Sequence, residues 1–245
     1  MLHESTEPAV TRRGMAFADA VFDGRAELDG MQGVRIDDPL EISRCLLARA
    51  AIPVVVLDLA RLLEHVHPDV LVDARMRKRA RPEIQRGLAS LTVGLGPGFV
   101  AGETTDLVVE TSWEGLGHVI SIGSSLALAG EPRPIAGYGR ERYVYAPFSG
   151  VFRTTFHIGD RVKAGEVLAR VETTLLAAPL AGAVRGLTRD GVTVSIGTKV
   201  IEVDPRDQAI TSGIGERPAR IADGVTRAIQ TWRKRARSQR RDCGS

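Results

Sequence analysis

The 245-residue sequence has only two cysteines and no long apolar run, and each scarcity removes a class of protein. Cys45 lies in an apolar helical stretch and Cys243 in a polar tail, which favours two unpaired thiols over a disulfide or a metal pair. No apolar run approaches the ~18 residues that cross a bilayer. The opening residues, MLHESTEPAVTRRG, lack the apolar core of a secretory signal. The sequence therefore predicts a cytoplasmic protein without a membrane span.

Motifs for hydrolase or metal chemistry are also missing. The chain has no GxSxG elbow, no cysteine–histidine pairing and no paired-carboxylate motif. His65 and His67 are spaced as HxH, but no companion motif supplies a third ligand. We predict no metal site.

Positive charge is concentrated near the carboxyl end of the chain. The formal net charge is +3, and six of the positive charges lie between Thr231 and Arg241, so the rest of the chain is near −3. Such a run could bind nucleic acid or an acidic partner, but more often it is a solvated helix end whose cations complement the helix dipole. No aromatic platform or nucleic-acid motif accompanies it, and we predict no nucleic-acid partner.

The first half of the chain alternates short apolar runs with helical ones. The predicted strands are 53–58 (PVVVLD), 70–73 (VLVD), 91–95 (LTVGL) and 107–111 (LVVET). Short, almost wholly apolar strands are typical of an open α/β sheet covered by helices. A helix over 39–50 precedes the first of them, with Asp37 or Asp38 as its cap. These patterns predict a partial Rossmann-like α/β domain over residues 1–129.

A connecting segment rich in Gly, Pro and charge follows over 130–142, and an internal repeat comes next. A shift of 32 positions aligns 146–171 with 178–203. The identical pairs are Ala146/Ala178, Pro147/Pro179, Gly150/Gly182, Arg153/Arg185, Gly159/Gly191, Val162/Val194, Gly165/Gly197 and Val171/Val203. Leu168 also meets Val200, and Phe152 meets Val184. Because each half is too small to bury its own apolar face, we predict that the two halves share one core.

The pattern APxxGxxxxxxxxGDxVxxGExLxxV in this repeat resembles the first half of biotinyl and lipoyl carrier domains. That resemblance implies a barrel-sandwich hybrid over 143–206. Carrier domains present a lysine on the hairpin that joins their halves, and the joint here, 172–177 (ETTLLA), has none. Lys163 and Lys199 lie within the two halves instead. An amide-linked arm needs an amine, so we predict neither biotin nor lipoate and no covalently bound cofactor. The module is then structural or a binding surface.

Stretches spread over some 200 residues resemble one known family, the selenium-dependent molybdenum hydroxylase system protein. They are RRGMAFADAVFDG (12–24), VLVDARMRKR (70–79), GLGPGFVAG (94–102), DLVVET and GLGHVI (between 106 and 120), RYVYAPFSG (142–150), then IGDRVKAGE, AAPLAGAVRGL, DGVTVSIGTKV and VDPR up to Arg206, and ARIADGVTRAI (219–229). The resemblance implies a bacterial accessory factor for molybdenum-cofactor hydroxylases, the group that contains xanthine and carbon monoxide dehydrogenases. It also implies a terminal helix, which we place within 207–245 together with the basic tail.

The resemblance departs at the start of the chain. Family members usually begin with a Gly-rich strand–turn–helix unit resembling a dinucleotide-binding loop, whereas residues 2–13 align with the second strand and its continuation. A short variant, a misplaced start site and a loop supplied by another chain all remain open. Nucleotide binding in the ordinary Rossmann manner is not expected.

The best candidate cleft combines two strand ends with a glycine loop. Loop 94–102 could cradle an anion on its amides, or it could be a tight structural turn. The loop glycines are Gly94, Gly96, Gly98 and Gly102. Asp73 ends one predicted strand, and ligands of α/β sheets bind at such strand ends. Alternatively, Asp73 caps a helix over 75–81, and we slightly favour this second interpretation. Lys78 matches the family's pattern, and Glu110 and Thr111 end a strand at the same expected sheet edge.

Three classes of function stay open. The first is an accessory protein acting in cofactor finishing or insertion, whose partners are hydroxylase subunits, other maturation factors or the molybdopterin cofactor, with the pterin phosphate on the amides of loop 94–102. The second is a nucleotide-dependent small-molecule enzyme, and the third is a non-catalytic interaction scaffold. Asp204 and Arg206, in DPR at the end of the module, are predicted to form a turn with an ion pair to the α/β part.

Overall fold

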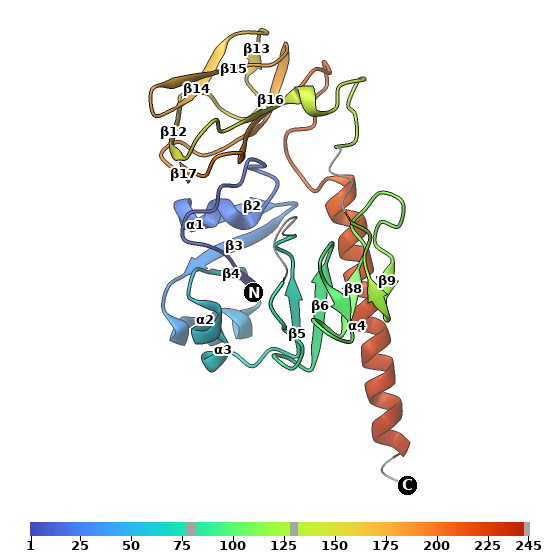
Figure 1. The fold of residues 1–245 in the computed structure, drawn as a ribbon. Coiled ribbons are helices and arrows are strands. Elements are labelled where there is room, and N and C mark those ends of the chain that lie inside the picture. Colours follow the sequence, from blue (N-terminus) through green and yellow to red (C-terminus); the bar gives the residue numbers. More distant parts are fainter. Residues whose placement is uncertain (77–81, 128–131, 243–245) are drawn as a thin grey trace. The chain divides into compact units, whose positions relative to one another are not determined.

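The computed structural model describes residues 1–76, 82–127 and 132–242 (Figure 1). The fold is mixed α/β, with several mixed and antiparallel sheets and a C-terminal helix. Two compact units are each built from two stretches of chain. Unit 1 is Met1–Leu59 with Glu131–Ile214, and unit 2 is Ala60–Gly130 with Gly215–Ser245. The boundaries predicted at 129/130, 142/143 and 206/207 follow changes of composition along the chain, and they stay predictions.

Unit 1 contains a four-stranded mixed sheet of order β1-β4-β3-β2. Its strands are β1 (Leu2–His3), β2 (Arg25–Leu28), β3 (Met31–Ile36) and β4 (Ile52–Val55). The β1–β4 and β3–β4 pairs are parallel and the β2–β3 pair is antiparallel. Two short helices, η1 (Phe17–Asp19) and α1 (Ala20–Asp23), precede β2, and their Ala20 and Val21 pack on Val54.

Helix α2 (Pro39–Ala48) confirms the predicted helix and its cap. Asp38 adopts extended backbone, and its side chain accepts a hydrogen bond from the amide of Leu40 (2.9 Å). Pro39 occupies the first turn, where its missing N–H costs nothing. Ile42 is the residue that this helix buries completely.

The rest of unit 1 is a β module of two four-stranded antiparallel sheets. One has the order β11-β18-β16-β13 and the other β15-β14-β12-β17. The strands are β11 (Tyr143–Tyr145), β12 (Gly150–Thr154), β13 (Arg161–Val162), β14 (Val167–Val171), β15 (Thr174–Ala177), β16 (Gly182–Leu187), β17 (Thr193–Val194) and β18 (Lys199–Asp204), with η2 (Arg140–Arg142) ahead of β11. Exchanging the two halves of the repeat converts one strand order into the other. The predicted internal repeat is confirmed.

Backbone hydrogen bonds follow the same two-fold relation. The amide of Gly159 donates to the carbonyl of Val184 (2.8 Å), and its repeat equivalent Gly191 donates to Phe152 (2.8 Å). Glycine is needed where two neighbouring strands approach closely: a Cβ on Gly182 of β16 would lie 2.2 Å from the carbonyl oxygen of Asp204 at the end of β18. Within the described residues the two sheets do not close into a barrel.

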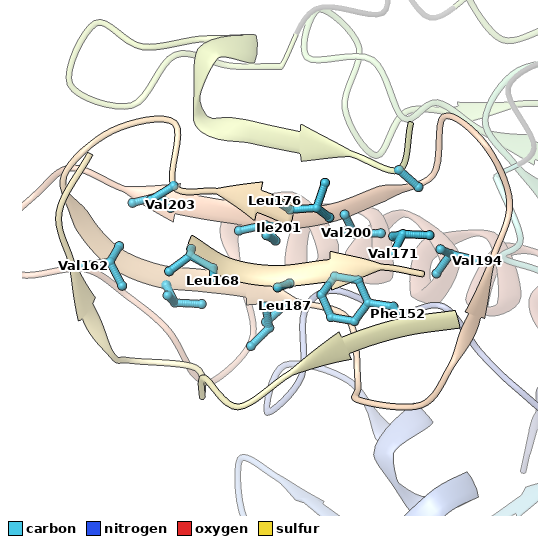
Figure 2. Packing of buried hydrophobic residues seen from close by; sticks show 14 of the residues in the cluster. Phe152, Val162, Leu168, Val171, Leu176, Leu187, Val194, Val200, Ile201 and Val203 are labelled. Carbon is cyan, nitrogen blue, oxygen red and sulfur yellow. The ribbon is translucent and has the colours of Figure 1, made fainter. Parts of the chain in front are cut away.

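Both sheets bury their apolar residues in one shared core (Figure 2). Phe152 and Leu168 from one half and Val184 and Ile201 from the other are almost completely buried. Neither half could exclude water from these side chains alone, so the shared core predicted from the repeat is confirmed.

The joint between the halves is a tight hairpin. Glu172, with φ of 49°, and Thr173 turn the chain from β14 into β15. The Glu172 carboxylate accepts from the Val151 amide (2.7 Å) and so fastens the turn to β12. No residue of the turn offers an amine for acylation.

Unit 2 holds a second mixed sheet, of order β5-β6-β8-β9. Its strands are β5 (Val70–Asp73), β6 (Leu91–Leu95), β8 (Leu107–Val109) and β9 (Val119–Ile120), while β7 (Val100–Ala101) pairs with β10 (Gly123–Ser124). The β5–β6 and β6–β8 pairs are parallel. The predicted strands 70–73 and 91–95 are confirmed to the residue. All five residues of β6, which lies between β5 and β8, are buried.

Two helices complete the fold. The first, α3 (Leu59–His65), connects the first stretches of the two units. The C-terminal helix α4 (Glu216–Asp242) packs on the unit 2 sheet, where Ile221, Val225, Ile229 and Trp232 join the cluster around Val93. Their spacing places them on one face of the helix. No helix in the described ranges is long and apolar enough to cross a membrane.

Candidate functional site

The carboxyl edge of the β5–β6–β8 sheet brings together most of the predicted site residues. In the parallel register Asp73 lies opposite Gly94, and Leu95 lies opposite Val109. Asp73 ends β5, and Gly96 and Glu110 directly follow β6 and β8, so the three residues lie at one edge of the sheet, as expected from the sequence. Lys78 lies outside the described residues.

Asp73 is buried and forms a dense set of hydrogen bonds. Its carboxylate accepts from the Arg75 amide and guanidinium (3.0 Å each) and from the Gln85 side-chain amide (2.5 Å). Burial alone would raise the pKa of the Asp73 carboxyl, but the hydrogen bonds from Arg75 and Gln85 outweigh it and hold the pKa below its ordinary value. Residues 74–76 are not helical, and the rest of the helix predicted over 75–81 lies outside the described residues. Asp73 thus shapes a turn.

Glu110 also accepts several hydrogen bonds, and its three donors among the described residues are backbone amides. Oε1 accepts from Thr111 (2.7 Å) and Ser112 (2.6 Å), and Oε2 accepts from Leu126 (2.7 Å). From α4, the Arg217 guanidinium donates to the carbonyl of Thr111 (2.8 and 3.0 Å). Burial lowers the pKa of Arg217, and the Glu110 charge acts in the opposite direction. This carboxylate organises the loops beyond β8.

The glycine loop after β6 is tightly packed against these residues. A Cβ on Gly96, which has φ of +83°, would lie 2.7 Å from Thr111 Oγ1, and one on Gly94 would lie 2.3 Å from the Phe99 ring. Thr111 Oγ1 is itself buried without a hydrogen-bond partner in the described part of the chain. The glycines therefore permit close approach as well as unusual backbone angles.

The loop amides fit a phosphate poorly. Those of Gly96, Val100 and Gly102 bond within the fold, to Val109, Thr104 and Thr105. Of the amides between them, only Gly98 and Phe99 lack a partner among the described residues, and proline 97 has no N–H. A phosphate cradle uses several converging amides, and the side chains of Asp73 and Glu110 at this edge are acidic, which disfavours an anion. The ligand role predicted for 94–102 stays a prediction.

Two residues of this edge were not predicted from the sequence. Gln85 reaches Asp73 from twelve residues away, and Arg217 reaches Thr111 from more than one hundred. A polar residue in a loop gives no local signal of such a contact. Considering only the residues that the structure describes, no group of three or more His, Cys, Asp or Glu side chains could hold a metal ion.

The fold described above is that of a mixed α/β protein with a two-fold β module. No protein-family model matches the chain. It is similar to the uncharacterized protein YqeB of Escherichia coli (strain K12), with 36% identity over 230 residues, or 92% of this chain. The similarity supports a relationship to YqeB-like proteins. The chain spans 42% of the length of YqeB, less than half.

Two solved structures are similar to parts of the chain. The ectoine utilization protein EutE (DoeB) from Ruegeria pomeroyi, in a product-bound structure, has a TM-score of 0.26 at 23% identity, covering 36% of this chain and 28% of that one. A succinylglutamate desuccinylase/aspartoacylase from Rhodobacter sphaeroides has a TM-score of 0.23 at 29% identity, covering 28% and 24%. Scores this low define neither a fold nor a function.

Proposed function

We propose that the protein is an accessory factor for molybdenum-cofactor hydroxylases of the xanthine or carbon monoxide dehydrogenase type, acting in cofactor finishing or insertion. The observation that carries the proposal is the ordered series of stretches from Arg12 to Arg206 that resembles a family of such factors. The similarity to YqeB over 92% of this chain supports a relationship between the two proteins, but YqeB is uncharacterized and so its name indicates no activity. Hydroxylase subunits, other maturation factors and the molybdopterin cofactor are the partners proposed, and the cytoplasm is the proposed compartment.

The finer fold assignments belong to the same proposal. We infer that the β module is a barrel-sandwich hybrid, because its two sheets exchange under the 32-residue repeat and share one core. The parallel β3–β4 pair with α2 between its strands supports a partial Rossmann-like arrangement in unit 1.

A non-covalent role suits this module. The hairpin at Glu172 carries no lysine, and the lysines of the module are placed elsewhere. Lys163 follows β13, where its amide bonds to Glu166, and Lys199 lies in β18 with its ammonium 4.5 Å from the centre of the Tyr143 ring. We therefore propose that the module binds partners by its surface, and we derive no reaction step through a bound cofactor.

Deletion of the gene tests the proposal. The host's molybdenum hydroxylases would be purified from mutant and parent and compared in activity, bound molybdopterin and the cyanide-labile sulfur or selenium at the metal. We expect inactive enzyme from the mutant. Cofactor present without its labile ligand would assign the protein to finishing, and absent cofactor would assign it to insertion. Full activity and unchanged composition would overturn the proposal and favour the small-molecule enzyme.

A further inference from the structure

A buried carboxylate in unit 1 is surrounded by cations. Glu202 of β18 has no exposed side-chain surface, and three guanidiniums converge on it. Arg12 lies 2.9 Å away, Arg185 of β16 lies 3.1 Å away, and Arg142 at the end of η2 forms a hydrogen-bonded ion pair with it. The Lys199 ammonium is 3.6 Å from the same carboxylate.

The positive charges outnumber the negative ones even without the lysine. The next carboxylate along β18, Asp204, is paired with Arg206 (2.7 Å) and lies 3.8 Å from Arg185. The predicted ion pair from this turn to the α/β part is therefore wrong: among the described residues Asp204 pairs with Arg206 in the turn and with Arg185 of β16, both in the β module. Counted over the described residues around β18, four guanidiniums (Arg12, Arg142, Arg185 and Arg206) face two carboxylates (Glu202 and Asp204), so the arginines leave two positive charges in excess. We call Arg12, Arg142, Arg185, Lys199 and Glu202 the cationic cluster.

Burial makes this excess costly. The side chain of Arg142 is 2% exposed and that of Arg185 15%, whereas Arg12 and Lys199 reach solvent at 29% and 33%. Burial lowers the pKa of Arg12 and so do its neighbours Arg185 and Arg142, although Glu202 acts against them. Partly buried like charges repel strongly, so a further anion at the exposed rim would stabilise the cluster.

The internal repeat shows that the fold itself does not require the cluster. Positions 32 residues earlier occupy equivalent places on the other sheet, where Glu202 corresponds to Arg170 and Lys199 corresponds to Val167. Arg185 corresponds to Arg153, which forms an exposed pair with Asp190 (3.3 Å). The same backbone therefore carries a buried cationic cluster on one sheet and an open surface on the other.

We propose that the outer face of the β11-β18-β16 sheet binds the phosphate group of a small molecule between Arg12, Arg185 and Lys199. Guanidinium groups present paired N–H donors that match phosphate oxygens, and the excess positive charge suits a phosphate dianion. Arg142 is too deeply buried to touch the ligand, so it positions Glu202 and Tyr143, whose hydroxyl accepts from it (2.8 Å). This inference does not depend on the hydroxylase function.

Calorimetric titration of the full chain tests the site, with inorganic phosphate and glycerol phosphate as probes at low salt. We expect binding of both probes if the site recognises the phosphate alone, and tighter binding of the ester if it also contacts the organic part. Arg12→Met should weaken binding about tenfold or more, as expected for loss of a charge-assisted hydrogen bond. Arg12→Lys, which keeps the charge, should retain part of the affinity.

Two further variants separate binding from structure. Arg153→Met removes the repeat equivalent of Arg185 on the other sheet and should leave phosphate affinity unchanged. Glu202→Gln removes the carboxylate that competes for the guanidiniums, so it should tighten phosphate binding, an effect that a purely structural ion network does not produce. Failure of the wild-type chain to bind either probe, or equal affinity in the Arg12→Met and wild-type chains, would overturn the proposal.

Discussion

Replacement of Arg142 by methionine tests whether the ion pair with Glu202 holds the β module together. Arg142 is buried, and besides Glu202 it donates to the carbonyl of Tyr138 (3.1 Å) and to the hydroxyl of Tyr143 (2.8 Å). Breaking a buried pair by removing one partner costs about 3–5 kcal/mol. Because Arg12 and Arg185 still face the carboxylate, we expect a loss of about 3 kcal/mol, at the lower end of that range.

Hydrogen exchange read by mass spectrometry measures this loss in unit 1 itself. Amides of β11, β16 and β18 should lose protection about a hundredfold, since every 1.4 kcal/mol is a factor of ten. Arg153→Met is the matched control: its pair with Asp190 is half-exposed and is expected to contribute less than about 1 kcal/mol. Equal protection in the two variants would refute the reasoning, because it would mean that the buried pair contributes no more than a surface one.

Three other predictions follow from single contacts. Gly96→Ala should destabilise unit 2 more than Gly102→Ala: both glycines have φ of +83°, but only the new Cβ at position 96 would lie against Thr111. Urea unfolding followed by tryptophan fluorescence compares the stabilities of the two variants, because both tryptophans lie in unit 2. Burial would raise the pKa of Glu202, but the surrounding cations hold this pKa below its ordinary value. The ionised Glu202 should therefore stabilise the fold above the unfolded pKa of about 4.3, and this stabilisation should be lost as the pH falls through the lower pKa of the folded state. Glu202→Gln should reduce this acid sensitivity, measured by hydrogen exchange of β18. Asp38→Ala should cost about 1 kcal/mol by removing the cap of α2, and an unchanged urea midpoint would contradict that role.

Local patterns predicted the parts of the fold that depend on local causes. β5 and β6 begin and end where their apolar runs do, and Asp38 caps α2 through an amide two residues away. The repeat was readable because both halves must keep the same turns and core positions. Its identical glycines and apolar pairs located the shared core without any knowledge of strand order.

Contacts between distant residues could not be predicted in this way. The pairing of Arg142 with Glu202 spans 60 residues, and Arg12 reaches the same carboxylate across 190. One signal was available: Glu202 lies between Ile201 and Val203, both buried in the core, and a charge inside so apolar a strand needs a partner. The sequence identifies the need for a cation there but not which arginine supplies it.

The candidate edge shows the same division. Asp73 ends β5 and Glu110 follows β8, and both strands run parallel to β6 between them, so their place at the same sheet edge was predictable from strand direction alone. Their hydrogen bonds were not predictable, because the donors are Arg75, Gln85 and the amides of residues 111, 112 and 126, which lie in loops without a regular pattern.

Restoration of a defective hydroxylase tests the proposed function most directly. Molybdenum hydroxylase purified from a strain that lacks this gene would be incubated with an extract of that strain, with and without the purified full chain, and assayed for activity. The accessory role predicts activity that rises only when the chain is added. A hydroxylase that is already fully active when isolated from the deletion strain would contradict it.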